Sequence, residues 1–204
     1  MNEAVFHISL AGTADQHAGG ILFLEKIILS RPDRIIVKLL GGGGLHPEAA
    51  LAFIDLLALL PAECERIACS YTSFAGAGDF ALWLKAGDIR DFRPNAMVWV
   101  PSLPSFSLAD ARLGAVLVED RSTFPDPVFQ WAYGRCIELI SEYVDPSTVL
   151  DRVLTAADLR DWLLIDSHAL DEALAKSNAH DHEATPLDPG GPTVDDFRFR
   201  GRQK

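Results

Sequence analysis

Arg34-Ile-Ile-Val-Lys-Leu-Leu-Gly-Gly-Gly-Gly-Leu-His-Pro-Glu48 is the stretch that decides the fold of this chain. Its first seven residues are nearly all apolar and partly β-branched, which is typical of a parallel strand buried on both faces. Four glycines follow, and residues 49–60 have the pattern of a helix, with Pro47 suited to its first turn. This order places backbone N–H groups at the carboxyl edge of a parallel sheet, where they can face an anion or an oxyanion.

Four glycines exceed what a tight turn needs. The loop is therefore predicted either as a plain turn or as an oxyanion or backbone-clamping loop, and the candidate ligand cleft contains Gly42, Gly43 and Gly44. His46 follows this loop after Leu45 and is the histidine that the sequence places nearest to the cleft, either as an active-site residue or as a solvated loop residue.

Strand-like and helical segments alternate along the first hundred residues. We predict strands over 5–10, 34–40, 66–71 and 96–100, and helices over 15–30, 49–60 and 80–85. Such alternation indicates an α/β domain with a mainly parallel sheet. Residues 101–127 are interpreted as a loop or an inserted hairpin, with 115–118 strand-like. Helices are predicted over 128–143, 147–150 and 155–162, the last opened by a Thr155 and Asp158 capping pattern. Residues 179–204 are read as a flexible polar tail behind a domain at 1–178.

The 204 residues carry 18 basic and 29 acidic side chains, a net charge of −11. This balance argues against binding to nucleic acid or to an anionic membrane surface, because phosphates need clustered basic groups. No apolar stretch reaches the ~18 residues of a membrane span, and the N-terminus lacks the pattern of a signal peptide. Three cysteines without paired spacing predict neither disulfides nor a metal site. We therefore expect a cytoplasmic protein without a cofactor.

Four segments, in this order and spacing, resemble motifs of one peptidase family. Gly42, Gly43 and Gly44 stand where that family has a Pro-Gly-Gly loop. The other segments are Ala-Gly-Asp-Phe-Ala-Leu-Trp-Leu-Lys-Ala-Gly at 77–87, Pro-Asn-Ala-Met-Val-Trp-Val-Pro at 94–101, and Leu-Asp-Arg-Val-Leu-Thr-Ala-Ala at 150–157 with Leu-Leu-Ile-Asp at 163–166. The chain thus resembles the Clp protease proteolytic subunit, and the resemblance implies the Clp/crotonase-like spiral of β-α units over roughly 5–174.

The resemblance does not extend to the catalytic triad. A serine peptidase needs a nucleophile, a base and a carboxylate that orients the base. Gly78 stands at the position of the family's serine and Pro101 at that of its histidine, and neither side chain can transfer a proton. Asp151 matches the orienting carboxylate, or it simply caps the following helix. The resemblance therefore implies a peptidase-like scaffold without its triad.

The sequence leaves open two ways in which the protein could still be an enzyme. Ser73 or Ser102 could act as a displaced nucleophile of a Clp-type serine hydrolase. Alternatively, residues 76–82 resemble the Gly-Gly-Gly-x-Glu-Leu-Ala pattern of crotonases, which act on acyl-CoA thioesters. In that case Asp79 matches a catalytic acid–base carboxylate. Otherwise Asp79 is a helix N-cap or first-turn acid, which the helix dipole favours.

The sequence thus predicts a catalytically degenerate Clp-peptidase-like protein. It would act as an oligomeric structural subunit, or bind extended peptides or acyl groups in the cleft of Gly42 to Gly44 and Gly76 to Asp79. The alternatives are the displaced-serine hydrolase and the crotonase-like enzyme, the latter with a CoA thioester. The resemblance also implies a homo-oligomer, as a ring, and as partners a Clp-type unfoldase or a paralogous subunit. The broad apolar surface of the helix predicted at 128–143 is compatible with subunit contact.

Overall fold

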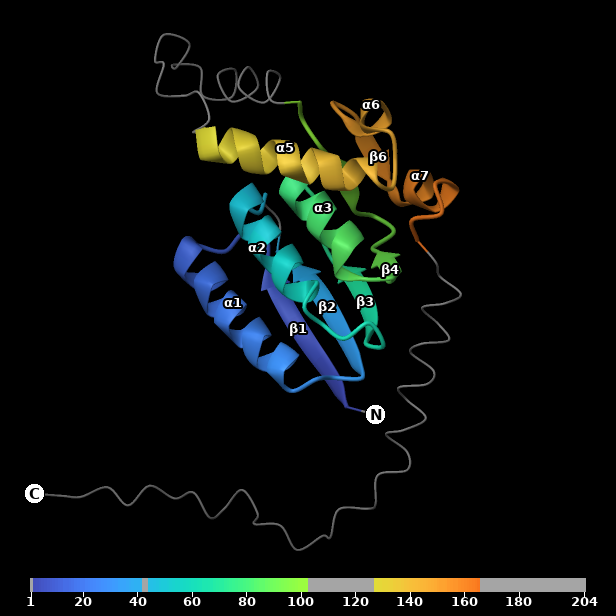
Figure 1. Cartoon of the computed structure of the whole chain (residues 1–204). Helices are drawn as coiled ribbons and strands as arrows, with labels where there is room; N and C mark the ends of the chain where they lie inside the picture. Colours follow the sequence, from blue (N-terminus) through green and yellow to red (C-terminus); the bar gives the residue numbers. More distant parts are fainter. Residues whose placement is uncertain (1, 42–43, 103–126, 166–204) are drawn as a thin grey trace, which may run out of the picture. The chain divides into compact units, whose positions relative to one another are not determined.

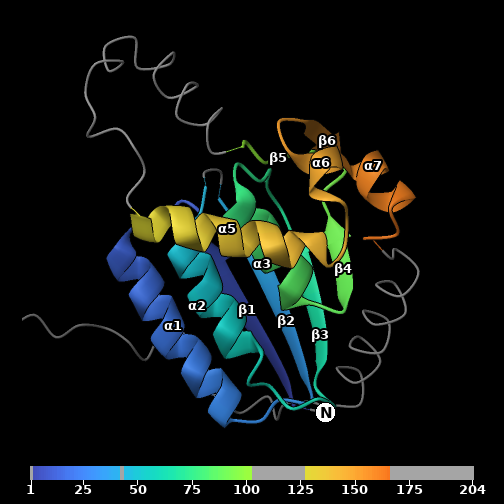
Figure 2. The same cartoon turned by 45° about the horizontal axis from the view of Figure 1, so that its top comes forward.

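The computed structural model describes residues 2–41, 44–102 and 127–165 (Figures 1 and 2). The elements are, in chain order, β1 (Glu3–Ser9), α1 (Ala14–Leu29), β2 (Arg34–Leu40), α2 (Pro47–Leu57), β3 (Glu65–Ser70), α3 (Ala77–Ala86), β4 (Ile89–Phe92), β5 (Met97–Trp99), α5 (Pro127–Ser141), α6 (Pro146–Val149), β6 (Val153–Thr155) and α7 (Ala156–Asp161). The first four strands form one parallel sheet in the order β1-β2-β3-β4, and β5 pairs with β6 in a small antiparallel sheet. The predicted α/β class with a mainly parallel sheet is confirmed.

The helices and strands that the sequence predicted lie close to their expected positions. The sequence interpretation missed β4 and β6, and it extended the second helix three residues beyond its end at Leu57. The capping pattern at Thr155 is confirmed, because its hydroxyl accepts from the Asp158 N–H while the Asp158 carboxylate accepts from the Thr155 N–H. The strand-like segment 115–118, the tail and the predicted domain boundary at 178 lie outside the described residues.

Helices α1, α2 and α3 lie side by side on one face of the parallel sheet, and α5 crosses over α2 and α3 (Figures 1 and 2). Apolar side chains of β1 and β2 alternate toward these helices; those of Phe6, Ile8, Val37 and Leu39 are buried. This packing puts the carboxyl ends of the strands and the N-termini of α2 and α3 at one edge, beneath α5.

Helix α3 is the centre of the core. Nine of its ten residues are buried, Lys85 being the one that is not fully so. The indole of Trp83 stacks on Phe80 with ring centroids 6.0 Å apart, and its Nε1 donates to the backbone oxygen of Asp91 at 3.0 Å. A helix that is apolar around its whole circumference is stable only when neighbours cover every side. Helix α3 therefore fixes the positions of α2, α5 and the sheet around it.

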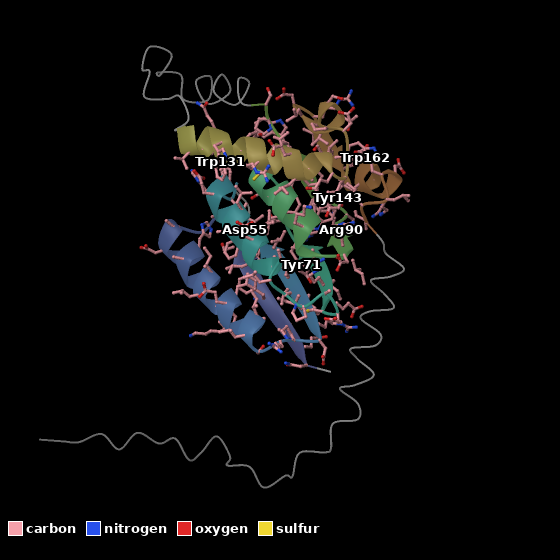
Figure 3. All side chains as sticks on the ribbon, in the orientation of Figure 1. Asp55, Tyr71, Arg90, Trp131, Tyr143 and Trp162 are labelled. Atoms are coloured by element: carbon pink, nitrogen blue, oxygen red, sulfur yellow. The ribbon has the colours of Figure 1, made fainter. Side chains whose placement is uncertain are left out.

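Arg90 joins the ends of several elements (Figure 3). Its guanidinium donates to the backbone oxygens of Leu84 at 3.1 Å, Gly87 at 2.8 Å and Leu164 at 3.0 Å. It also lies over the ring of Tyr143, 5.3 Å from the centroid. One side chain thus ties the end of α3 to the turns that follow α5 and α7.

Candidate functional site

The glycine loop after β2 packs against the segment that precedes α3. Gly41 has φ 78°, a left-handed conformation that glycine adopts at little cost. Gly42 and Gly43 of the predicted cleft lie outside the described residues. A Cβ atom on Gly44 would lie 3.3 Å from the backbone oxygen of Ala75. The end of the loop therefore meets the neighbouring segment backbone to backbone.

Asp79 connects these two segments. Its side chain is fully buried in the first turn of α3, where Oδ1 accepts from the Leu45 N–H at 2.6 Å and Oδ2 from the Ala75 N–H at 3.0 Å. Burial raises the pKa of Asp79 to about 7, because desolvation of the charged form outweighs the two backbone hydrogen bonds, which lower it. The position fits a first-turn acid; a catalytic role for Asp79 stays a prediction.

Gly78, which the resemblance sets at the position of the catalytic serine, has no space for a side chain. A Cβ atom there would lie 2.8 Å from the Leu45 oxygen, 3.3 Å from the Ala50 Cβ and 3.4 Å from the Pro47 Cα. Two of these three neighbours are backbone atoms, one of Leu45 just before α2 and one of Pro47 at its first position, and backbone cannot move aside as a flexible side chain could. The close approach of α2 to α3 therefore depends on a glycine at position 78.

Pro101 and Asp151 take part in hydrogen bonds that involve backbone groups. Pro101 is buried, and its carbonyl oxygen accepts a hydrogen bond from the Tyr133 hydroxyl. Asp151 Oδ1 accepts from the Ser102 N–H at 2.9 Å, and the Asp151 N–H donates to the Val100 oxygen at 2.9 Å. The alternative in which Asp151 caps the following helix is wrong, because Thr155 caps α7. Asp151 instead holds the chain that leaves β5.

The candidate nucleophile Ser73 and the candidate base His46 have partners of other kinds. Ser73 Oγ accepts from the Met97 N–H at 3.0 Å. His46 occupies the N-cap position of α2 without a side-chain capping bond; its Nδ1 contacts the Glu48 carboxylate, and its side chain is 62% exposed. The ring of His46 also meets Phe129 of α5 edge-on, with centroids 5.2 Å apart. The structure thus pairs His46 with a carboxylate rather than with Ser73.

Helix α5 covers the positions that match the triad. Tyr133 reaches Pro101, and burial together with nearby Asp151 raises the pKa of its hydroxyl. One turn further, Cys136 is completely buried, and its Sγ lies 4.0 Å from the Pro47 oxygen. Burial raises the pKa of Cys136 to about 12, so the thiol stays neutral. These two buried side chains of α5 thus contact the backbone at Pro101 and at the first residue of α2.

An open hollow of about 600 Å³ lies beside this region, between α1 and α2. Small and apolar side chains make up most of its lining, and Gly44, His17, His46 and Glu48 supply the polar part; the remaining residues are Gly12, Ala14, Ala18, Ile21, Ala49 and Ala52. The Nε2 of His17 lies 3.0 Å from the Ser9 oxygen, so Nε2 carries the proton that it donates there. The hollow can accept an apolar chain with a polar end.

Within the described ranges, no three His, Cys, Asp or Glu side chains come together as a metal site would require. None of the helices in those ranges is long and apolar enough to cross a membrane. The three cysteines are buried free thiols.

Sequence reasoning missed four residues that shape the site. Leu45 and Ala75 act through their backbone amides, which no side-chain pattern reveals. Tyr133 and Cys136 lie on the predicted helix 128–143, where their spacing of three residues indicated one face but not what that face covers. Their partners are distant in sequence, so only the fold brings them to the site.

No family model and no curated protein sequence matches the chain. Similar solved structures do exist. A mutant of the 1510-N membrane-bound stomatin-specific protease has a TM-score of 0.54 at 14% identity, over 87% of this chain and 84% of its own. A second mutant of that protease, in complex with a substrate peptide, has a TM-score of 0.51 at 16% identity, over 87% and 80%. ClpP1 from Listeria monocytogenes has a TM-score of 0.48 at 16% identity, over 80% and 88%. At 14% and 16% identity, the two TM-scores above 0.5 show that this chain shares the fold of the 1510-N protease and nothing more.

Proposed function

We propose that this chain is a catalytically degenerate Clp-peptidase-like protein that acts as an oligomeric subunit and binds an extended peptide or acyl ligand. The observation that carries this proposal is the packing at Gly78. Acyl transfer needs a nucleophile with open space for the carbonyl that it attacks. At Gly78 the backbone of Leu45 fills the space that even a Cβ atom would need.

The surroundings of the other two positions support the same proposal. Pro101 has no proton to exchange, and its carbonyl is engaged by Tyr133. Asp151 accepts a backbone hydrogen bond from Ser102. Each position that matches the triad thus has a structural partner, which favours a scaffold over a peptidase.

The hollow between α1 and α2 supports ligand binding. Its apolar lining suits an acyl chain or apolar peptide side chains, whereas His46 and Glu48 can bond to polar groups at one end. Ala49 and Ala52 lie half-buried on α2 and keep the hollow open because their side chains are small. A large side chain at either position would fill it.

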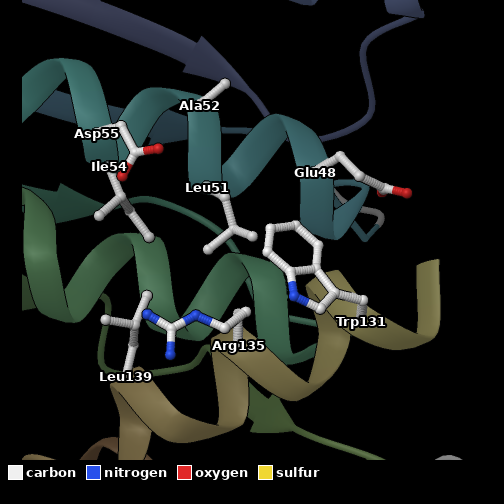
Figure 4. A pocket seen from close by; sticks show the side chains of 8 residues that line it. All are labelled: Glu48, Leu51, Ala52, Ile54, Asp55, Trp131, Arg135 and Leu139. Carbon is white, nitrogen blue, oxygen red and sulfur yellow. The ribbon is translucent and has the colours of Figure 1, made fainter. Parts of the chain in front are cut away.

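A second surface supports assembly. The groove between α2 and α5 has a volume of about 470 Å³, with Leu51 and Ile54 of α2 facing Trp131 and Leu139 of α5 (Figure 4). Trp131, which lines this groove, is 62% exposed. Exposed aromatic side chains beside apolar grooves are typical of subunit contacts.

The decisive experiment for degeneracy is labelling of the full-length protein with a fluorophosphonate probe. We expect that the probe does not label this protein, whereas a serine hydrolase used as positive control is labelled. Labelling that disappears in Ser73→Ala or Ser102→Ala would contradict the proposal and identify a displaced nucleophile. A thermal shift with CoA that disappears in Asp79→Asn would instead support the crotonase-like alternative.

Ligand binding and assembly have separate tests. A thermal shift with octanoyl-CoA or with an apolar peptide should be lost in Ala52→Trp and kept in Ala58→Trp, which changes α2 at its C-cap outside the hollow. Light scattering should show an oligomer that Trp131→Ser weakens, whereas Leu29→Ser, at an 81% exposed position of α1, leaves it intact. A monomeric wild type would contradict the subunit role.

A further inference from the structure

The carboxylate of Asp79 lies between two segments that are far apart in the chain. One is the segment of Gly44 and Leu45 that leads into α2, and the other is the segment from Ala75 to Gly78 that opens α3. Each oxygen of Asp79 accepts one backbone N–H, from Leu45 at 2.6 Å and from Ala75 at 3.0 Å. A single ionisable group thus provides a hydrogen bond to both segments.

The two segments also touch directly. The Cβ positions of Gly44 and Gly78 would lie 3.3 Å and 2.8 Å from backbone oxygens of the opposite segment. Bare backbone on both sides permits this approach. The two hydrogen bonds of Asp79 join the segments at the point where their backbones meet, and so help to keep them in register.

The surroundings of Asp79 disfavour the ionised form of its carboxyl group. From α5 it is faced by Cys136, a neutral thiol, while Tyr133 on the same helix points to Pro101. From the first turn of α2, Glu48 adds negative charge to this region and pairs with His46. Burial is the dominant effect on the Asp79 carboxyl and places its pKa at about 7.

We propose that Asp79 is a proton-operated clamp that holds the start of α2 to the start of α3. When ionised, the carboxylate accepts both backbone hydrogen bonds, each strengthened by its charge. When protonated, one oxygen becomes a hydroxyl, which is a poorer acceptor than a carboxylate oxygen and carries a proton that needs an acceptor of its own. Protonation therefore weakens the two hydrogen bonds, most of all the one to the protonated oxygen, and loosens the link that Asp79 makes between Leu45 and Ala75.

The test is an NMR titration of the wild-type, full-length protein from about pH 5.5 to 8.5, a range centred on the pKa. The carboxyl ¹³C resonance of Asp79 reports its protonation, and the amide resonances of Leu45 and Ala75 report the two hydrogen bonds. We expect all three signals to titrate with one midpoint near neutral pH. The amide signals should move upfield at low pH, because a weaker hydrogen bond shields the amide proton.

Two variants locate the titrating group. His46→Gln removes the imidazole that directly follows Leu45 in the chain and should leave the three midpoints unchanged. Asp55→Asn removes a carboxylate elsewhere on α2 and should also have no effect. Amide signals of Leu45 and Ala75 that stay constant while the Asp79 carboxyl titrates would overturn the proposal. So would a midpoint that disappears in His46→Gln. Both outcomes are independent of folding in an Asp79 variant and of the proposed function.

Discussion

Replacing Gly78 by alanine should destabilise the protein, whereas the same replacement at Gly134 should stabilise it. Both glycines lie within helices, α3 and α5, so both replacements improve helix propensity. They differ in what the new methyl group meets. At Gly78 it would lie 2.8 Å from the Leu45 oxygen, whereas at Gly134 it meets no atom of the described residues within 4 Å.

The expected magnitudes follow from these contacts. Alanine is favoured over glycine inside a helix by about 1 kcal/mol, which is the whole effect expected at Gly134. Overpacking a close contact costs about 1–3 kcal/mol. The upper part of that range applies at Gly78, because the Asp79 carboxylate holds Leu45 in place. The net loss at Gly78 is therefore about 2 kcal/mol, and the two variants should differ by about 3 kcal/mol.

Urea unfolding followed by tryptophan fluorescence and circular dichroism measures both variants. For a chain of this length, 1 kcal/mol corresponds to roughly 2–4 °C in melting temperature, so the difference is also visible in a thermal scan. The matched control is Gly134→Ala, which carries the same chemical change. A Gly78→Ala variant as stable as the wild type would refute the packing argument, and the position could then accept a serine.

Three further predictions concern single side chains. Between about pH 5 and 6 the native state keeps a proton on Asp79 that the unfolded chain has lost, because folding raises this pKa from 3.8 to about 7. As the pH rises through this range, the free energy of unfolding of the wild type, measured in urea relative to that of Asp79→Asn, should therefore fall by about 1.4 kcal/mol per pH unit, and it should level off above pH 7. A free-energy difference that increases with pH would contradict the raised pKa of Asp79. Tyr133→Phe removes the hydroxyl that donates to the buried Pro101 carbonyl, and it should lower the free energy of unfolding in urea by about 1–3 kcal/mol. The matched change Tyr71→Phe, at an exposed position, should lower it little. Thr155→Ala removes the N-cap of α7 and should lower stability by about 1 kcal/mol, with Thr155→Ser restoring most of it in the same assay.

The long elements of the fold were predictable because each has a clear period and end signals. The apolar run 34–40 matches β2, and Pro47 begins α2 as its rigid φ favours. Strand β4 was missed because it has only four residues, with Arg90 and Asp91 between its apolar ends. Its position comes from the adjacent strand β3, so tertiary pairing decides it rather than local pattern.

The site was predictable in its location and not in its contacts. The substitutions at Gly78 and Pro101 are visible in the sequence, as is the acid at position 79. The hydrogen bond from Leu45 to Asp79 joins residues 34 apart in the chain, and its donor is a backbone amide. Backbone donors are identical at almost every residue, so only the three-dimensional approach of α2 to α3 shows which one is used.

The burial of α3 has a consequence for hydrogen exchange. Amides of a helix exchange with solvent only after the helix opens, and a helix covered on every side opens only when its neighbours leave. Nine of the ten residues of α3 are buried, whereas α1 has many exposed positions and frays at lower cost. The amides of α3 should therefore be the slowest to exchange, and their rates give the free energy of global unfolding without any denaturant.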